Sequence, residues 1–120
     1  MPAAARPLPA LALMGLIFFL SAQSDLDTGL GTIDFIARKI GHATIFGALC
    51  GLWYWAFRSR LGPAPALIAA TAVAVAYAGS DEFHQGFVAG RTGSPVDVAI
   101  DTAGIALAAL AIRRFARARP

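Results

Sequence analysis

Residues 65–79 have the sequence PALIAATAVAVAYAG, which contains no charged residue and predicts a helix in an apolar environment. Three further predominantly apolar segments cover residues 8–22, 40–57 and 96–112. Each is near the lower limit of roughly 17 residues for a membrane-spanning helix. Backbone groups in lipid need internal hydrogen bonds, and no segment alternates as a barrel strand does. The sequence therefore predicts an all-α integral membrane bundle of four transmembrane helices, forming a single domain over residues 1–120.

The composition also favours lipid as the environment of the chain. Of the 120 residues, 58% are hydrophobic and 14% are charged, whereas about a quarter of the residues in soluble domains are charged. A soluble fold of this size leaves roughly a third of its surface exposed, so it could not hide so much apolar surface. Within segment 40–57, Gly47 and Gly51 form a GxxxG pair, which predicts close packing against another helix.

The distribution of arginine and lysine predicts the orientation. By the positive-inside rule, the more basic side of a multi-pass protein faces the cytoplasm. Seven basic residues fall on the side of the termini, against Arg38, Lys39 and Arg91 on the other. The seven are Arg6, Arg58, Arg60, Arg113, Arg114, Arg117 and Arg119. The sequence therefore predicts a protein of the bacterial inner (cytoplasmic) membrane, with cytoplasmic termini and with connections 23–38 and 80–95 outside.

Two alternative hypotheses about the ends of the chain, nucleic-acid binding and a signal peptide, are disfavoured. Nucleic acid is not an expected partner, because the C-terminal arginines follow an apolar run and resemble a membrane-flanking anchor. Residues 1–22 could form a signal peptide, but Leu20 would occupy the −3 position for cleavage after Ala22, which is a poor site. The single cysteine, Cys50, excludes an intrachain disulfide and is expected to pack within a helix.

The start of segment 40–57 carries polar side chains at helical spacing. Lys39, His42 and Phe46 recur at i, i+3 and i+7 and therefore share one helical face. One hypothesis places Lys39 and His42 at the membrane interface, among headgroups and water. The other makes His42 a proton donor or acceptor, or a ligand of an anionic group, because histidine titrates near neutral pH.

Residues 80–95 hold the densest polar chemistry of the chain. If the helix of segment 65–79 continues, Asp81, His84 and Gln85 share one face, with Glu82 turned about 100° away. Arg91 follows in a glycine-rich turn, and its planar guanidinium suits bidentate binding of phosphate.

The last apolar segment opens with two carboxylates one helical turn apart, Asp97 and Asp101. Asp97 is also explained by the helix dipole alone. A carboxylate at the centre of a membrane helix costs about 2.5 to 3.5 kcal/mol, so we expect Asp101 to face the bundle and to be paired. Its candidate partners are Arg91, His42 and Lys39.

These regions supply the candidate site, and we expect the polar residues to converge because the bundle has one shared interior. The ligand-binding candidates are Lys39, His42, Asp81, Glu82, His84, Gln85, Arg91, Asp97 and Asp101. If the protein is an enzyme, which the sequence leaves open, His42 and Glu82 are the candidate general acid or base. No HExxH or comparable spacing occurs, so neither a metal nor another cofactor is predicted.

From Phe18 to Leu110 the chain resembles the VanZ-like family. That family pairs Lys-x-x-His and a following aromatic residue with Asp-Glu-x-x-Gln-x-Phe-x-Pro-Gly-Arg, two acidic or amide residues four apart, and a glycine. The matching residues are Lys39, His42, Phe46, Asp81, Glu82, Gln85, Phe87, Gly90, Arg91, Asp97, Asp101 and Gly104. Two positions depart from the pattern: Ala89 replaces a proline, and Phe46 stands where tyrosine is common.

The resemblance implies a bacterial envelope protein of a family named for teicoplanin-type glycopeptide resistance. The leading hypothesis is that the outward-facing candidate residues bind an anionic lipid, a lipid-linked precursor or a glycopeptide-type antibiotic. The alternative is a membrane-embedded hydrolase or transferase that acts on a lipid phosphate or glycolipid. A proton or ion pathway is disfavoured, because the chain lacks the inverted repeats with broken helices that transporters use. The oligomeric state is not predicted.

Overall fold

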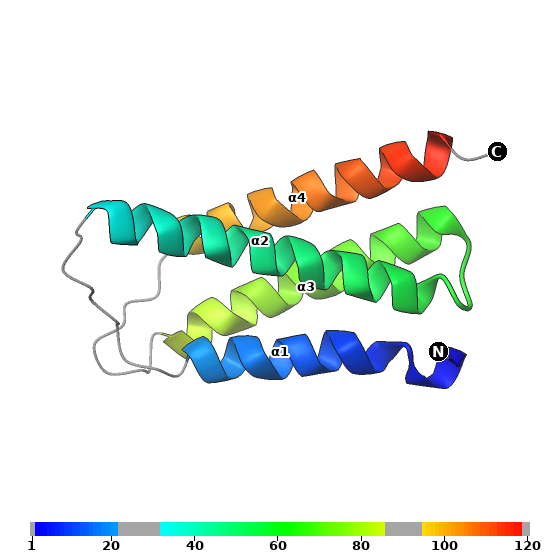
Figure 1. The fold of residues 1–120 in the computed structure, drawn as a ribbon, viewed down its shortest axis with the longest axis horizontal. Helices are drawn as coiled ribbons and strands as arrows, with labels where there is room; N and C mark the ends of the chain where they lie inside the picture. The colour runs from blue at the N-terminus through cyan, green and yellow to red at the C-terminus, as the bar shows by residue number, and fades with distance from the viewer. Residues whose placement is uncertain (1, 22–31, 86–94, 119–120) are drawn as a thin grey trace.

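The computed structural model describes residues 2–21, 32–85 and 95–118, and this part of the chain is helical (Figure 1). A short 3-10 turn, Ala3–Ala5, precedes α1 (Pro7–Ser21), α2 (Thr32–Phe57), α3 (Pro63–Gln85) and α4 (Pro95–Ala118). The prediction of an all-α bundle is therefore confirmed over the described residues. Both Pro63 and Pro95 stand at the first position of a helix, where the missing N–H of proline costs no hydrogen bond.

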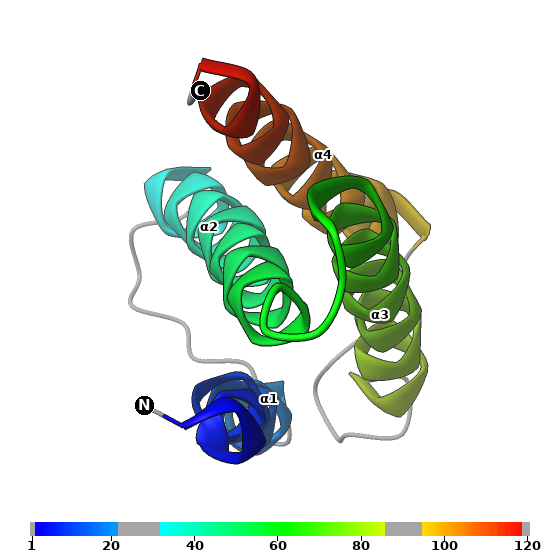
Figure 2. The same ribbon diagram turned by 90° about the vertical axis from the view of Figure 1, so that its right-hand side faces the viewer.

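The four helices form an up-and-down bundle (Figure 1). The N-terminus, the turn between α2 and α3, and the C-terminal end of α4 lie at one end of the bundle, so α2 and α4 run in the same direction. Both α2 and α3 contact each of the other three helices. Seen end-on, α1 and α4 lie on opposite sides of these two central helices (Figure 2).

Three helices extend beyond the predicted apolar segments. Helix α2 begins at Thr32 instead of residue 40, α3 continues to Gln85 instead of ending at residue 79, and α4 continues to Ala118 instead of ending at residue 112. The predicted connections 23–38 and 80–95 were therefore too long, and residues 32–38 and 80–85 are helical. Hydropathy marks only the part of a helix that suits lipid, whereas charged residues such as Lys, Arg and Glu are good helix formers.

Small side chains line the centre of the bundle. Ala66, Ala70, Ala74 and Ala78 recur every four residues along α3 and are fully buried. Large apolar side chains are exposed on every helix: Leu8, Leu11, Leu16, Phe18 and Phe19 on α1, Ile36 and Ile40 on α2, Ile68 and Phe83 on α3, and Leu107, Leu110 and Phe115 on α4. Membrane bundles show this pattern, because small residues let helices approach closely and lipid accepts the large ones.

Glycine allows the closest approach in the fold, between α2 and α4. A Cβ atom on Gly104 would lie 2.2 Å from the carbonyl oxygen of Ala43, and one on Gly47 would lie 3.1 Å from the carbonyl oxygen of Gly104. A Cβ atom on Gly51 would have no neighbouring atom within 4 Å. The predicted packing role of the GxxxG pair therefore holds for Gly47 but not for Gly51, whose side of α2 meets no close neighbour.

Two of the described helices are long and apolar enough to cross a membrane: α2 over Ile36–Phe57 and α3 over Pro63–His84. A shorter apolar helix covers Ala3–Phe19. By length and composition, two of the four predicted membrane helices are therefore candidate membrane spans.

Candidate functional site

The polar faces of α2 and α4 meet in register, because the two helices run side by side in the same direction. Lys39 forms an ion pair with Asp97, and one turn further the Nδ1 atom of His42 lies 2.8 Å from Oδ1 of Asp101. The next turn brings Gly104 against Ala43. The spacing of three residues on α2 matches that of four on α4, so Lys39 and His42 each face one carboxylate of α4.

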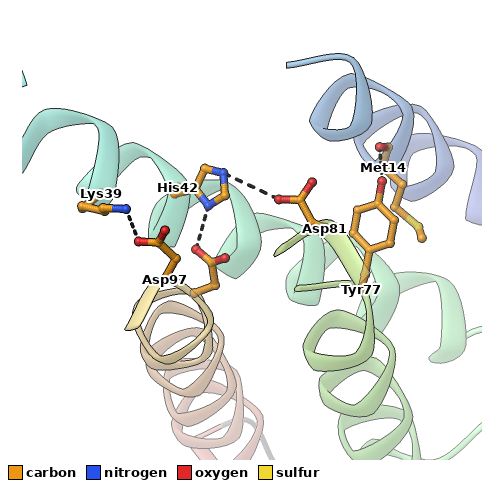
Figure 3. A network of polar contacts seen from close by, with 7 residues as sticks. Met14, Lys39, His42, Tyr77, Asp81 and Asp97 are labelled. Atoms are coloured by element: carbon orange, nitrogen blue, oxygen red, sulfur yellow. Dashed lines mark hydrogen bonds and ion pairs between the residues drawn. The ribbon is translucent and has the colours of Figure 1, made fainter. Parts of the chain in front are cut away.

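Helix α3 contributes a third carboxylate to this group. Oδ2 of Asp81 lies 3.8 Å from Nε2 of His42 (Figure 3). That distance exceeds the length of a hydrogen bond, but the carboxylate still faces the ring nitrogen that Asp101 leaves open. Three helices therefore bring Lys39, His42, Asp81, Asp97 and Asp101 together, and we call these five residues the polar cluster.

Burial differs sharply across the polar cluster. Asp101 is 1% exposed, whereas the side chain of His42 is 28% exposed. Among the described residues, Oδ2 of Asp101 has no hydrogen-bond partner. A buried carboxylate needs a partner to offset its lost hydration, and in the described structure that partner is His42. The expected pairing of Asp101 is thus found, with His42 as the partner.

The other candidates on α3 are Glu82, His84 and Gln85. Glu82 is buried like Asp81, although helical periodicity turns it to another face; α3 contacts three helices, so more than one of its faces is covered. The ring of His84 stacks on Phe18 of α1, with 4.4 Å between ring centroids. Gln85 ends α3, and its side chain lies outside the described residues, as does Arg91. The binding role of all nine candidates stays a prediction.

Tyr77 is a neighbour of the cluster that sequence reasoning missed. Its hydroxyl donates to the carbonyl oxygen of Met14 and so joins α3 to α1 (Figure 3). Its ring lies 6.2 Å from that of Phe46, which itself lies 5.4 Å from the ring of His42. The available signal was a tyrosine one turn before Asp81, within residues 72–78, which are otherwise alanine and valine.

In the part of the chain that the structure describes, no group of three His, Cys, Asp or Glu side chains is placed to hold a metal ion.

Two apolar helices long enough to span a membrane, a core of small residues and a polar cluster between three helices indicate a helical membrane protein with polar residues inside the bundle. The family model described as VanZ/LLP1 matches residues 8–116. The chain therefore belongs to the VanZ/LLP1 family, as the resemblance of its motifs predicted. Comparison with curated proteins and with solved structures gives no match.

Proposed function

We propose that all four helices lie in the bacterial inner membrane, with both termini in the cytoplasm. Exposed large apolar side chains on α1 and α4 support this arrangement, because contiguous apolar surface is unfavourable in water. With 24 residues, α4 is about 36 Å long, enough for the hydrocarbon core of roughly 30 Å. Asp97 and Asp101 lower its hydropathy, but both contact α2.

The basic residues at one end of the bundle support this orientation. Arg6 donates to the carbonyl oxygen of Trp55, 3.2 Å away, and its guanidinium lies 4.9 Å from the centroid of the Trp55 ring. This contact joins the start of α1 to the last turn of α2, next to Arg58 and Arg60. Arginine with aromatic residues at helix ends is typical of the cytoplasmic interface.

Labelling of single cysteines tests the orientation. In a Cys50→Ala background, we expect a membrane-impermeant maleimide to label Thr92→Cys in intact cells or spheroplasts, and to label Ser59→Cys only after the membrane is opened. Native Cys50 is buried. Its replacement by alanine changes none of the basic residues that set the topology. Labelling of Thr92→Cys only from the cytoplasmic side would overturn the orientation.

We further propose that the polar cluster binds the headgroup of an anionic lipid or a lipid-linked envelope precursor at the outer leaflet. The observation that carries this proposal is the convergence of α2, α3 and α4 on His42, whose ring is partly exposed. His42 lies six residues, about 9 Å, from the start of the span Ile36–Phe57, a depth close to the headgroups. Binding of a glycopeptide-type antibiotic, with a role in resistance, is the form of this function that the family name suggests.

Removing the charge of Arg91 tests headgroup binding. We expect Arg91→Ala to weaken binding of phosphatidylglycerol to the purified protein by about 10- to 150-fold, because charge-assisted hydrogen bonds contribute about 1.5 to 3 kcal/mol. Arg60→Ala removes the same charge from the turn between α2 and α3 and should leave this affinity unchanged. Equal effects of the two variants would show that net charge, and not a specific contact of Arg91 with the headgroup, governs binding.

A second candidate function, hydrolysis or group transfer on a lipid phosphate or glycolipid, is favoured by one contact. The buried carboxylate of Asp101 holds the ring of His42, as an orienting carboxylate holds a general base in many enzymes. If Glu82 moves a proton, Glu82→Gln should lower turnover by about 10² to 10⁴ at unchanged affinity. If the site only binds, the same variant should leave both lipid affinity and the cellular lipid profile unchanged, which is the result we expect.

A further inference from the structure

The contact between His42 and Asp101 fixes the location of a proton. Nδ1 of His42 lies 2.8 Å from Oδ1 of Asp101, and an ionised carboxylate can only accept hydrogen bonds. The hydrogen bond therefore requires a proton on Nδ1. In the neutral ring, the other nitrogen, Nε2, then carries a lone pair and can only accept.

The surroundings of the pair determine which of its atoms a ligand can reach. Asp101 is 1% exposed, but the side chain of His42 is 28% exposed. Nε2 lies on the side of the ring that faces Asp81 (Figure 3), and its 3.8 Å distance from Oδ2 is too long for a hydrogen bond. A ligand atom that approaches Nε2 of the neutral ring thus meets the lone pair of the imidazole.

We propose, resting on the headgroup-binding function above, that Asp101 is a positioning residue that holds His42 as the Nδ1–H tautomer. The headgroup atom received at Nε2 is a hydroxyl. A hydroxyl carries one hydrogen, which it can donate to the lone pair of Nε2. The lipid selected by the cluster is therefore one whose headgroup carries hydroxyls, either on glycerol or on a sugar.

Nitrogen NMR of His42 tests the tautomer without any ligand. In the ¹⁵N-histidine-labelled protein in nanodiscs, at a pH above the titration of the ring, Nδ1 should give a pyrrole-type signal and Nε2 a pyridine-type signal. His42→Gln assigns the signals, because the only other histidine is His84. A protonated Nε2, a mixture of tautomers, or an imidazolium that persists at alkaline pH would overturn the assignment.

Two carboxylate-to-amide variants separate positioning from simple polarity. Asp101→Asn should mix the tautomers of His42, because an amide can donate to Nδ1 as well as accept from it; the same exchange in serine proteases gives the wrong tautomer. Asp81→Asn, on the other side of the ring, should keep the Nδ1–H tautomer. Loss of the tautomer in Asp81→Asn but not in Asp101→Asn would assign the positioning role to the wrong carboxylate and overturn the proposal.

Four probe lipids separate hydroxyl recognition from charge. Phosphatidylglycerol and phosphatidylmethanol have the same charge, but only the first carries hydroxyls; glucosyl diacylglycerol is neutral with sugar hydroxyls; phosphatidylcholine has neither feature. We expect the Nε2 signal to shift with phosphatidylglycerol, with the glycolipid or with both, which identifies the source of the hydroxyl. Equal shifts with phosphatidylmethanol would support headgroup binding but contradict the recognition of a hydroxyl at Nε2. No shift with any of the four would overturn both.

Discussion

Gly104→Ala is expected to separate α4 from α2 and to destabilise the bundle by about 3 kcal/mol, the upper part of the usual range for overpacking. The added Cβ atom would lie 2.2 Å from the carbonyl oxygen of Ala43. That neighbour is backbone, so it cannot rotate away, and one of the two helices has to move. Movement of α4 would also pull Asp101 away from His42. Unfolding in mixed detergent micelles, followed by circular dichroism, measures the change in free energy.

A graded series provides the control for this prediction. Gly47→Ala should cost less than Gly104→Ala, because its Cβ would lie 3.1 Å from the carbonyl oxygen of Gly104. Gly51→Ala meets nothing within 4 Å and should be neutral or slightly stabilising, since alanine favours helix over glycine by about 0.5 to 1 kcal/mol. If all three variants behave alike, the close approach of α2 and α4 is not what stabilises the bundle.

His42→Leu is expected to be the most destabilising single change in the polar cluster, at about 3 to 5 kcal/mol. It leaves the carboxylate of Asp101, 1% exposed, without its one hydrogen-bond partner among the described residues. The double variant His42→Leu/Asp101→Leu should recover most of the loss, because replacing both members of a buried pair by apolar residues is often nearly neutral. Additive effects of the two changes would show that the pair does not act as a unit.

The neighbouring ion pair serves as the matched control for the single and double variants of His42 and Asp101. In the pair of Lys39 and Asp97, the side chains are 28% and 15% exposed, so water can partly replace a lost partner. Lys39→Met should therefore cost about 1 kcal/mol or less, in the range of exposed ion pairs. The difference between His42→Leu and Lys39→Met measures how much of the stability of the cluster depends on the burial of Asp101.

Local sequence patterns were sufficient to predict the helices and to select the polar candidate residues. Helix formation depends on local backbone hydrogen bonds, and residues such as Asp81 and Asp101 stand out because lipid penalises any unpaired charge. Motif spacing was also sufficient to identify the family. The predicted helix ends were wrong. Residues 32–38 and 80–85 lie outside the apolar segments but are still helical.

Only the tertiary structure shows which faces of the helices pack against one another. Nothing in the separate spacings of Lys39 and His42 or of Asp97 and Asp101 says that they pair in order; that follows from the parallel course of α2 and α4 and from the close approach at Gly104. Likewise, only packing distinguishes Gly47 from Gly51. The physical reason is that contacts between helices depend on the fit of whole surfaces brought together by the fold, whereas periodicity describes one helix at a time.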